Sequence, residues 1–123
     1  MSVSTRIIDA CFSASGNVRY VAVYIDGSLE LKPRADMQLL GSRESDRYEE
    51  IIVNPTLLKM LSQRGNIDCG GLKYVIVRYG NFFAFIYPLV NGHVTVSFEL
   101  TTRLDDEAKM ISDVIDGRVA IGD

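Results

Sequence analysis

Residues 72–100 read LKYVIVRYGNFFAFIYPLVNGHVTVSFEL, three apolar or alternating runs separated by Gly80-Asn81 and Asn91-Gly92. Asn-Gly readily adopts the two positive φ angles of a type I′ turn, and Gly-Asn places glycine where a type II′ turn requires it. Each pair is therefore typical of the tip of a tight antiparallel hairpin. The stretch predicts a three-stranded meander, with strands over residues 72–79, 82–90 and 93–100.

A second hairpin is predicted nearer the N-terminus, around Asp26-Gly27. The preceding residues 19–25 are rich in β-branched and aromatic side chains on both faces, as in an interior strand. Residues 28–32 form a shorter, alternating partner, and Pro33 after them fits an edge strand. We expect the hairpin to join the meander through the strands at 19–25 and 93–100, giving one five-stranded antiparallel sheet.

Three helices are expected to flank this sheet. Residues 5–14 and 55–64 carry apolar side chains at helical spacing, and Thr102 is placed to cap a third helix that ends at Gly117. Asn54 followed by proline is a favourable start for the middle helix, and Gly65 is a natural stop.

The segment between Pro33 and the middle helix is harder to interpret. Residues 35–47 are polar and predict a loop, whereas residues 45–53 fit either a helix or a strand. The predicted fold class is α+β, in the order helix, strand, strand, helix, strand, strand, strand, helix.

Composition is that of an ordinary globular domain. The 123 residues are 47% hydrophobic and 24% charged, so we expect one domain over residues 1–123. A formal net charge of −3 argues against nucleic-acid binding through the phosphate backbone. No apolar run reaches the roughly 18 residues of a membrane helix, and no signal-peptide pattern is present, which predicts a cytoplasmic protein.

Residues that could carry chemistry are few. His93 is the only histidine, and the two cysteines, Cys11 and Cys69, lie far apart in the sequence. His93 directly follows a turn, where a polar residue needs no special role, and no local motif pairs it with Cys69. We expect no catalytic residue, no metal site and no bound cofactor. Arg78 lies inside an apolar strand and either pairs with a carboxylate such as Glu99 or faces a partner.

The order and lengths of these elements resemble the roadblock family, which includes dynein light chains and bacterial GTPase-regulator domains. The resemblance rests on the apolar strand before Asp26-Gly27, the helix through Leu57 to Leu61, and the meander at 72–100. It implies a non-catalytic homodimer in which the strand after the central helix pairs with its symmetry mate. Two features differ from a usual member: the loop from Pro33 to Tyr48 is long, and Pro55 interrupts the central helix.

The strand at 72–79 ends the meander, so its free apolar edge also favours self-association on physical grounds. The candidate residues for a dimer or partner interface are Leu58, Leu61, Leu72, Tyr74, Ile76 and Arg78. The leading hypothesis is a dimeric adaptor or regulator that binds another protein, with a small GTPase implied by the resemblance. The alternative is a small-molecule sensory domain of PAS or profilin type, with a cavity lined by Tyr24, Phe85 and Phe98. An enzyme of unrecognised type is the third hypothesis.

Overall fold

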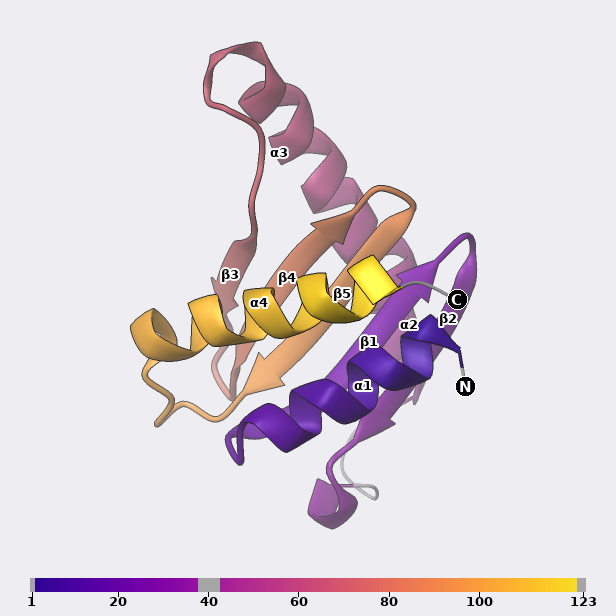
Figure 1. The fold of residues 1–123 in the computed structure, drawn as a ribbon, viewed down its shortest axis with the longest axis vertical. Coiled ribbons are helices and arrows are strands. Elements are labelled where there is room, and N and C mark those ends of the chain that lie inside the picture. The colour runs from indigo at the N-terminus through magenta and orange to yellow at the C-terminus, as the bar shows by residue number, and fades with distance from the viewer. Residues whose placement is uncertain (1, 38–42, 122–123) are drawn as a thin grey trace.

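A computed structural model describes residues 2–37 and 43–121 of the chain, and in it two layers of helices enclose one sheet (Figure 1). The elements in chain order are α1 (Val3–Ala14), β1 (Val18–Ile25), β2 (Ser28–Pro33), η1 (Ala35–Met37), α2 (Arg43–Tyr48), η2 (Glu49–Val53), α3 (Asn54–Asp68), β3 (Val75–Arg78), β4 (Phe83–Leu89), β5 (Gly92–Phe98) and α4 (Leu104–Ile121). The expected α+β class and the order of its long elements are confirmed.

The sheet has five strands in the order β2-β1-β5-β4-β3, and each neighbouring pair is antiparallel. This is the predicted arrangement, with the β5 strand beside β1. The third strand is shorter than predicted, because β3 covers only Val75–Arg78 rather than residues 72–79. Residues 72–74 belong to the chain returning from the far end of α3, where no strand lies opposite them (Figure 1).

The three hairpin turns use their glycines differently. Asp26 and Gly27 have φ angles of 50° and 83°, so this turn forms as predicted. Gly80 and Asn81 also form a hairpin tip, where the Tyr79 N–H donates to the Phe82 carbonyl at 3.0 Å, but without a positive φ.

The predicted tip at Asn91-Gly92 is wrong by one residue. Gly92 already pairs with Leu89 as the first residue of β5, so Val90 and Asn91 form the tip. Gly92 is needed for a close contact rather than for a turn angle. A Cβ there would lie 1.7 Å from the Tyr24 carbonyl oxygen on β1.

The apolar core lies between the sheet and the helix pair α1 and α4, which run side by side across one face (Figure 1). Alternate residues of the central strands point to this face, as their two-residue period requires. The buried members of the core are Ile7, Ile8, Cys11, Val18, Val21, Val23, Phe85, Val94, Val96, Phe98, Ala108, Ile111 and Ile115.

The opposite face of the sheet is covered by α2, η2 and the start of α3, which follow one another without a break in helical structure. The ambiguous residues 45–53 are therefore helical. The loop predicted for residues 35–47 is wrong where η1 and α2 form short helices, and residues 38–42 of that prediction lie outside the described part of the chain.

Pro55 does not interrupt the central helix, because a π-helical turn precedes it. A proline lacks the N–H donor and its ring clashes with the carbonyl four residues back in a regular helix. Here η2 widens the backbone, and the Asn54 N–H donates to the Glu49 carbonyl five residues earlier. Asn54 itself has helical φ and ψ angles of −67° and −43°, so it is not the predicted N-cap.

The predicted helix ends are also corrected. Gly65 lies inside α3, where a Cβ would come within 3.3 Å of the Gly71 and Leu72 backbone, so it allows the returning chain to pack closely. The reversal itself follows at Gly70 and Gly71, whose φ angles are +77° and +86°. Helix α4 begins at Leu104, two residues after the predicted Thr102 cap, and continues past Gly117 to Ile121.

Candidate functional site

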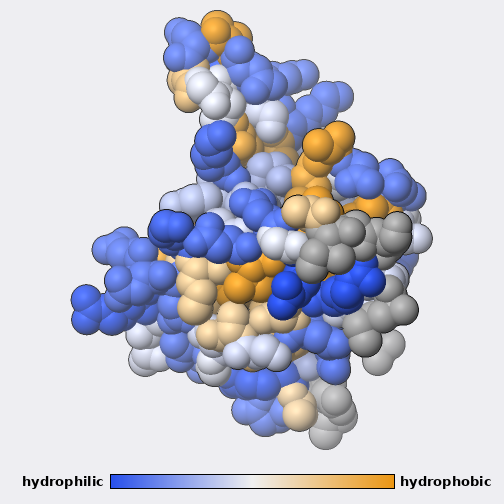
Figure 2. Space-filling model, in the orientation of Figure 1, coloured by the Kyte–Doolittle hydropathy of each residue, from blue (hydrophilic) through white to orange (hydrophobic). Residues whose placement is uncertain are grey.

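Helix α3 projects well beyond the edge of the sheet, and its far end turns back towards β3 (Figure 1). The projecting half exposes large apolar side chains: Met60 is 63% exposed, Ile67 76%, and Leu61 is exposed beside them. Hydrophobic atoms at the end of this projection are visible in Figure 2. Single exposed apolar residues are common, but several on one projecting helix make this half of α3 a candidate interaction site.

Strand β3 lies next to this helix in sequence and at the edge of the sheet. Its only strand partner among the described residues is β4, so its outer edge has no strand beside it. Tyr74 and Ile76 are exposed there, while Val75 and Val77 are half-buried. We call Met60, Leu61, Ile67, Tyr74 and Ile76 together the α3–β3 surface.

The six residues expected at an interface differ in how far they are exposed. Leu61, Tyr74, Ile76 and Arg78 are exposed, and Leu72 is half-buried. Leu58 is only 7% exposed and packs within the chain itself. The sequence could not distinguish Leu58 from Leu61, because both have the helical spacing of a buried stripe.

Arg78 does not pair with Glu99. Its guanidinium lies over the Phe83 ring, 5.7 Å from the centroid, and Nη1 donates to the Tyr79 and Gly80 carbonyls at 2.5 and 3.2 Å. Arg78 thus stabilises the turn between β3 and β4.

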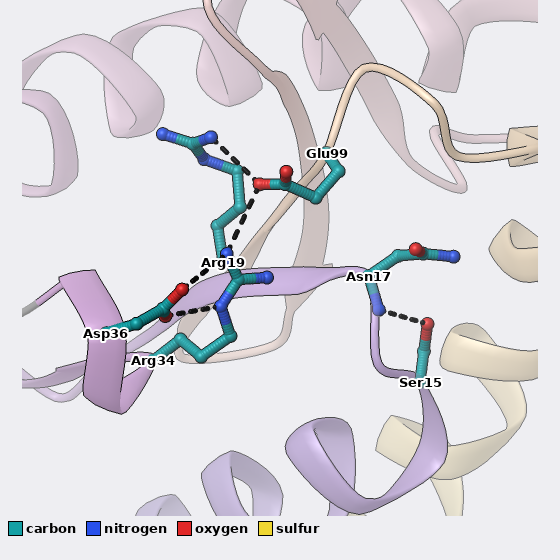
Figure 3. Close-up of polar contacts among 6 residues, drawn as sticks. All are labelled: Ser15, Asn17, Arg19, Arg34, Asp36 and Glu99. Atoms are coloured by element: carbon teal, nitrogen blue, oxygen red, sulfur yellow. Dashed lines mark hydrogen bonds and ion pairs between the residues drawn. The ribbon is translucent and has the colours of Figure 1, made fainter.

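Glu99 instead lies between two arginines (Figure 3). Its Oε1 is 2.9 Å from Nη1 of Arg19 and 3.6 Å from Nη2 of Arg34, whose Nε is 2.7 Å from Oδ1 of Asp36. The hydrogen bond from Arg34 lowers the pKa of the exposed Asp36 carboxyl. This network links the start of β1, the segment after β2 and the residue after β5. It therefore stabilises the packing of these three segments against one another.

A buried polar cluster connects the central helix to the other face of the sheet. Glu50 from η2 accepts hydrogen bonds at Oε1 from Thr95 Oγ1 at 2.6 Å and from Asn54 Nδ2 at 3.1 Å. The same oxygen lies 2.8 Å from Nε2 of His93, and the Tyr20 hydroxyl donates to Oε2. Four polar side chains thereby surround the carboxylate, which makes this cluster structural rather than reactive.

Sequence reasoning did not identify Glu50. The only signal was the polar face of β5, at His93, Thr95 and Ser97, a pattern that a strand facing water also shows. The cluster is shielded from water, as the Tyr20 hydroxyl shows. Burial raises the pKa of Tyr20 far above its ordinary value, and the neighbouring Glu50 charge raises it further.

The potentially reactive side chains do not converge. His93 is enclosed by the polar cluster, whereas Cys69 is exposed at the end of α3, with Arg64 Nη1 3.4 Å from its Sγ. Within residues 2–37 and 43–121, no three His, Cys, Asp or Glu side chains are grouped as metal ligands. No helix in the same part of the chain is both long and apolar enough to span a bilayer.

The aromatic cavity expected for a sensory domain does not form. Phe85 and Phe98 are fully buried in the apolar core beneath α1 and α4. Tyr24 lies on the opposite face of the sheet, where its ring centroid is 5.8 Å from that of His93. The three side chains therefore line no common space.

Known structures with this architecture were found by comparison of folds. No protein-family model matches the sequence, and no curated protein matches it. A Roadblock/LC7 domain from Streptomyces avermitilis superposes with a TM-score of 0.68 at 10% identity, covering 98% of this chain and 93% of that one.

Two bacterial proteins called MglB have the same fold. The gliding protein MglB from Thermus thermophilus gives a TM-score of 0.64 at 10% identity, covering 94% of this chain and 87% of that one. MglB from Myxococcus xanthus gives 0.64 at 12% identity, covering 92% and 90%. The resemblance inferred from the sequence is confirmed at the level of the fold: this chain has a roadblock-like fold.

Proposed function

We propose that this chain is a non-catalytic regulatory domain that forms a homodimer and acts by binding another protein. The observation that carries the proposal is the α3–β3 surface, where a projecting apolar helix lies beside an unpaired strand edge. An exposed strand edge with apolar side chains is an aggregation hazard unless a partner covers it.

A second copy of the chain would cover both the exposed side chains of α3 and the free edge of β3. Antiparallel pairing of two β3 strands about a two-fold axis would extend the sheet across the dimer and use the free backbone groups. The same axis brings the projecting α3 helices together, so that Met60, Leu61 and Ile67 become buried. Arg78 at the end of β3 then lies near the border of the contact. Such an interface should exceed about 1,000 Å² in total.

Support also comes from the structural relatives, one of which is described as MglB with a tetrameric arrangement. Self-association is thus recorded for a protein of this fold at 9% identity. The small GTPase as partner rests on the roadblock resemblance alone, which is an argument by analogy.

The dimer is tested by light scattering coupled to size-exclusion chromatography. The unmodified chain should elute as a dimer at micromolar concentration, and Leu61→Glu or Met60→Glu should convert it to a folded monomer. Gln63→Glu, an exposed position on the same helix, is the matched control and should remain dimeric. A monomeric unmodified protein would overturn the proposed dimer.

The protein partner is tested by affinity capture from native lysate, followed by identification of the retained proteins. A small GTPase should be retained by the unmodified chain and by Gln63→Glu. If every retained GTPase also binds a tag-only matrix, the GTPase assignment is wrong even where the dimer holds.

A further inference from the structure

A pocket of about 270 Å³ opens on the face of the sheet that carries the central helix. Asp46 from α2 and Glu49 from η2 contribute carboxylates to it, while Tyr20 and Phe82 contribute aromatic rings. Ser97 of β5 lines it as well. The pocket shares Tyr20 with the buried polar cluster but lies outside that cluster and away from the projecting half of α3.

Among the described lining residues, no cationic side chain forms an ion pair with the two carboxylates of this pocket. Burial raises the pKa of both the Asp46 and the Glu49 carboxyl, and the nearby Glu50 charge raises each further, although a hydrogen bond from Tyr79 partly offsets the effect at Glu49. The one cationic side chain in the described lining is Arg19, and its guanidinium is already bound to Glu99 at 2.9 Å (Figure 3).

A second observation is independent of charge. Ser97 on β5 is only 3% exposed and lines the pocket. Buried polar side chains in native structures are almost always hydrogen-bonded to protein, water or ligand. The Ser97 hydroxyl at the pocket wall therefore offers a hydrogen bond to a polar group that enters the pocket.

We propose that this pocket binds an organic cation of side-chain size, a guanidinium or ammonium group on a short apolar stem. Asp46 and Glu49 bind the charge, the Ser97 hydroxyl accepts one of its N–H groups, and the Tyr20 and Phe82 rings contact the stem and the face of the cation.

The size and composition of the pocket select this class of ligand. Its volume lies below the range of about 300–1,000 Å³ usual for drug-sized ligands, and it suits a single side chain. A hard divalent cation would require about six oxygen ligands, which two carboxylates and one hydroxyl do not supply. The Phe82 ring already has the Arg19 guanidinium 5.7 Å from its centroid, so it accepts cations.

Such a cation can come from a free metabolite or from an arginine or lysine of a bound protein. Titration of the ¹⁵N-labelled chain, followed by amide chemical shifts, distinguishes these sources. Butylguanidinium is the free probe, N-acetyl-arginine methylamide presents the same group on a peptide backbone, and butylurea is the neutral isostere. Butylguanidinium should shift the amides of Tyr20, Phe82 and Ser97, whereas butylurea should not.

Binding of the capped arginine as well as butylguanidinium assigns the pocket to a partner's side chain, and binding of butylguanidinium alone assigns it to a free cation. Glu49→Gln and Asp46→Asn should each weaken binding by about tenfold or more, and Ser97→Ala by several-fold. Glu44→Gln on α2, a carboxylate outside the pocket lining, is the matched control and should bind as the unmodified chain does.

Three outcomes would overturn the proposal. These are shifts of equal size with butylurea, no shifts with millimolar butylguanidinium, or unchanged affinity in a Glu49→Gln variant whose spectrum shows it to be folded. Because the pocket does not include the α3–β3 surface, a monomeric protein that binds butylguanidinium would contradict the proposed dimer and leave this site intact.

Discussion

Nε2 of His93 lies 2.8 Å from Oε1 of Glu50, in a contact where the two side chains are 2% and 0% exposed. This contact links β5 to η2 and thereby fixes the central helix on the sheet. A buried carboxylate is tolerated only when its lone pairs are hydrogen-bonded, so every donor in the cluster contributes to holding η2 in place.

Replacing His93 by alanine should lower the free energy of unfolding by about 3–5 kcal/mol, because it removes a hydrogen-bonding partner of the buried Glu50 side chain and leaves a cavity. Urea denaturation followed by circular dichroism measures the change. Cys69→Ala, an exposed position, is the control and should stay within about 0.5 kcal/mol. A loss below about 1 kcal/mol for His93→Ala would show that Glu50 does not depend on this partner.

Most of the sheet could be predicted from the sequence because its information is local. Asp26-Gly27 and Gly80-Asn81 each mark a reversal between two runs that are adjacent in the chain, and strand pairing follows directly. The junction between β1 and β5 followed from residues 19–25, whose two apolar faces predict an interior strand with a neighbour on each side.

The buried polar cluster could not be predicted, because its contacts are distant in the sequence. Glu50 meets Tyr20, His93 and Thr95 across separations of 30, 43 and 45 residues. No local pattern distinguishes Glu50 from the neighbouring Glu49, and the π-turn that orients it depends on Pro55 five residues later.

The errors at glycines have a similar cause. The local sequence predicts a helix end at Gly65 and a turn at Gly92, the usual local roles of glycine. In the structure both allow another backbone to approach, that of Gly71 and Leu72 in one case and that of Tyr24 in the other. A close approach depends on tertiary packing, which the local sequence does not specify.

Tyr79 and Tyr87 should lose their hydroxyl protons at a higher pH than a free tyrosine does. The Tyr87 hydroxyl donates to Oδ1 of Asp116 at 2.7 Å, and burial together with this hydrogen bond raises its pKa to about 12. Burial also raises the pKa of Tyr79 to about 12. Because the folded pKa values exceed the unfolded value of about 10, the stabilisation is complete below pH 10 or so and is lost as the pH rises towards 12.

Ultraviolet absorbance of tyrosinate, recorded while circular dichroism shows the chain to be folded, measures these pKa values. Asp116→Asn should shift the Tyr87 transition towards its ordinary value and leave the Tyr79 transition unchanged. Titration of all tyrosines together near their ordinary pKa in the folded protein would contradict the hydrogen bond to Asp116.

The two cysteines should differ sharply in reactivity. Cys11 is fully buried, and burial raises its pKa to about 12 despite the opposing charge of Arg118. The thiolate is the reactive form, so iodoacetamide at pH of about 8 should modify Cys69 and spare Cys11 until the chain is unfolded in urea. Peptide mass spectrometry locates the label. Equal labelling of both thiols in the native state would show that α1 does not close over the core as described.

Gly92→Ala should be among the most damaging single substitutions in the sheet. The added Cβ would lie 1.7 Å from the Tyr24 carbonyl oxygen and 2.8 Å from its carbon, and both atoms belong to backbone that cannot move without breaking β1–β5 pairing. We expect the free energy of unfolding to fall by about 3 kcal/mol or more, measured by urea denaturation.

Gly80→Ala is the matched control, because Gly80 is also next to an asparagine at a hairpin, has no positive φ and would place its Cβ in open space. Its effect should stay within about 0.5 kcal/mol. If the two glycines served only to make their turns flexible, the two substitutions would cost the same. A large difference between them instead measures how tightly β1 and β5 approach at Tyr24, and equal, small effects would mean that the pairing of Gly92 with Ile25 is wrong.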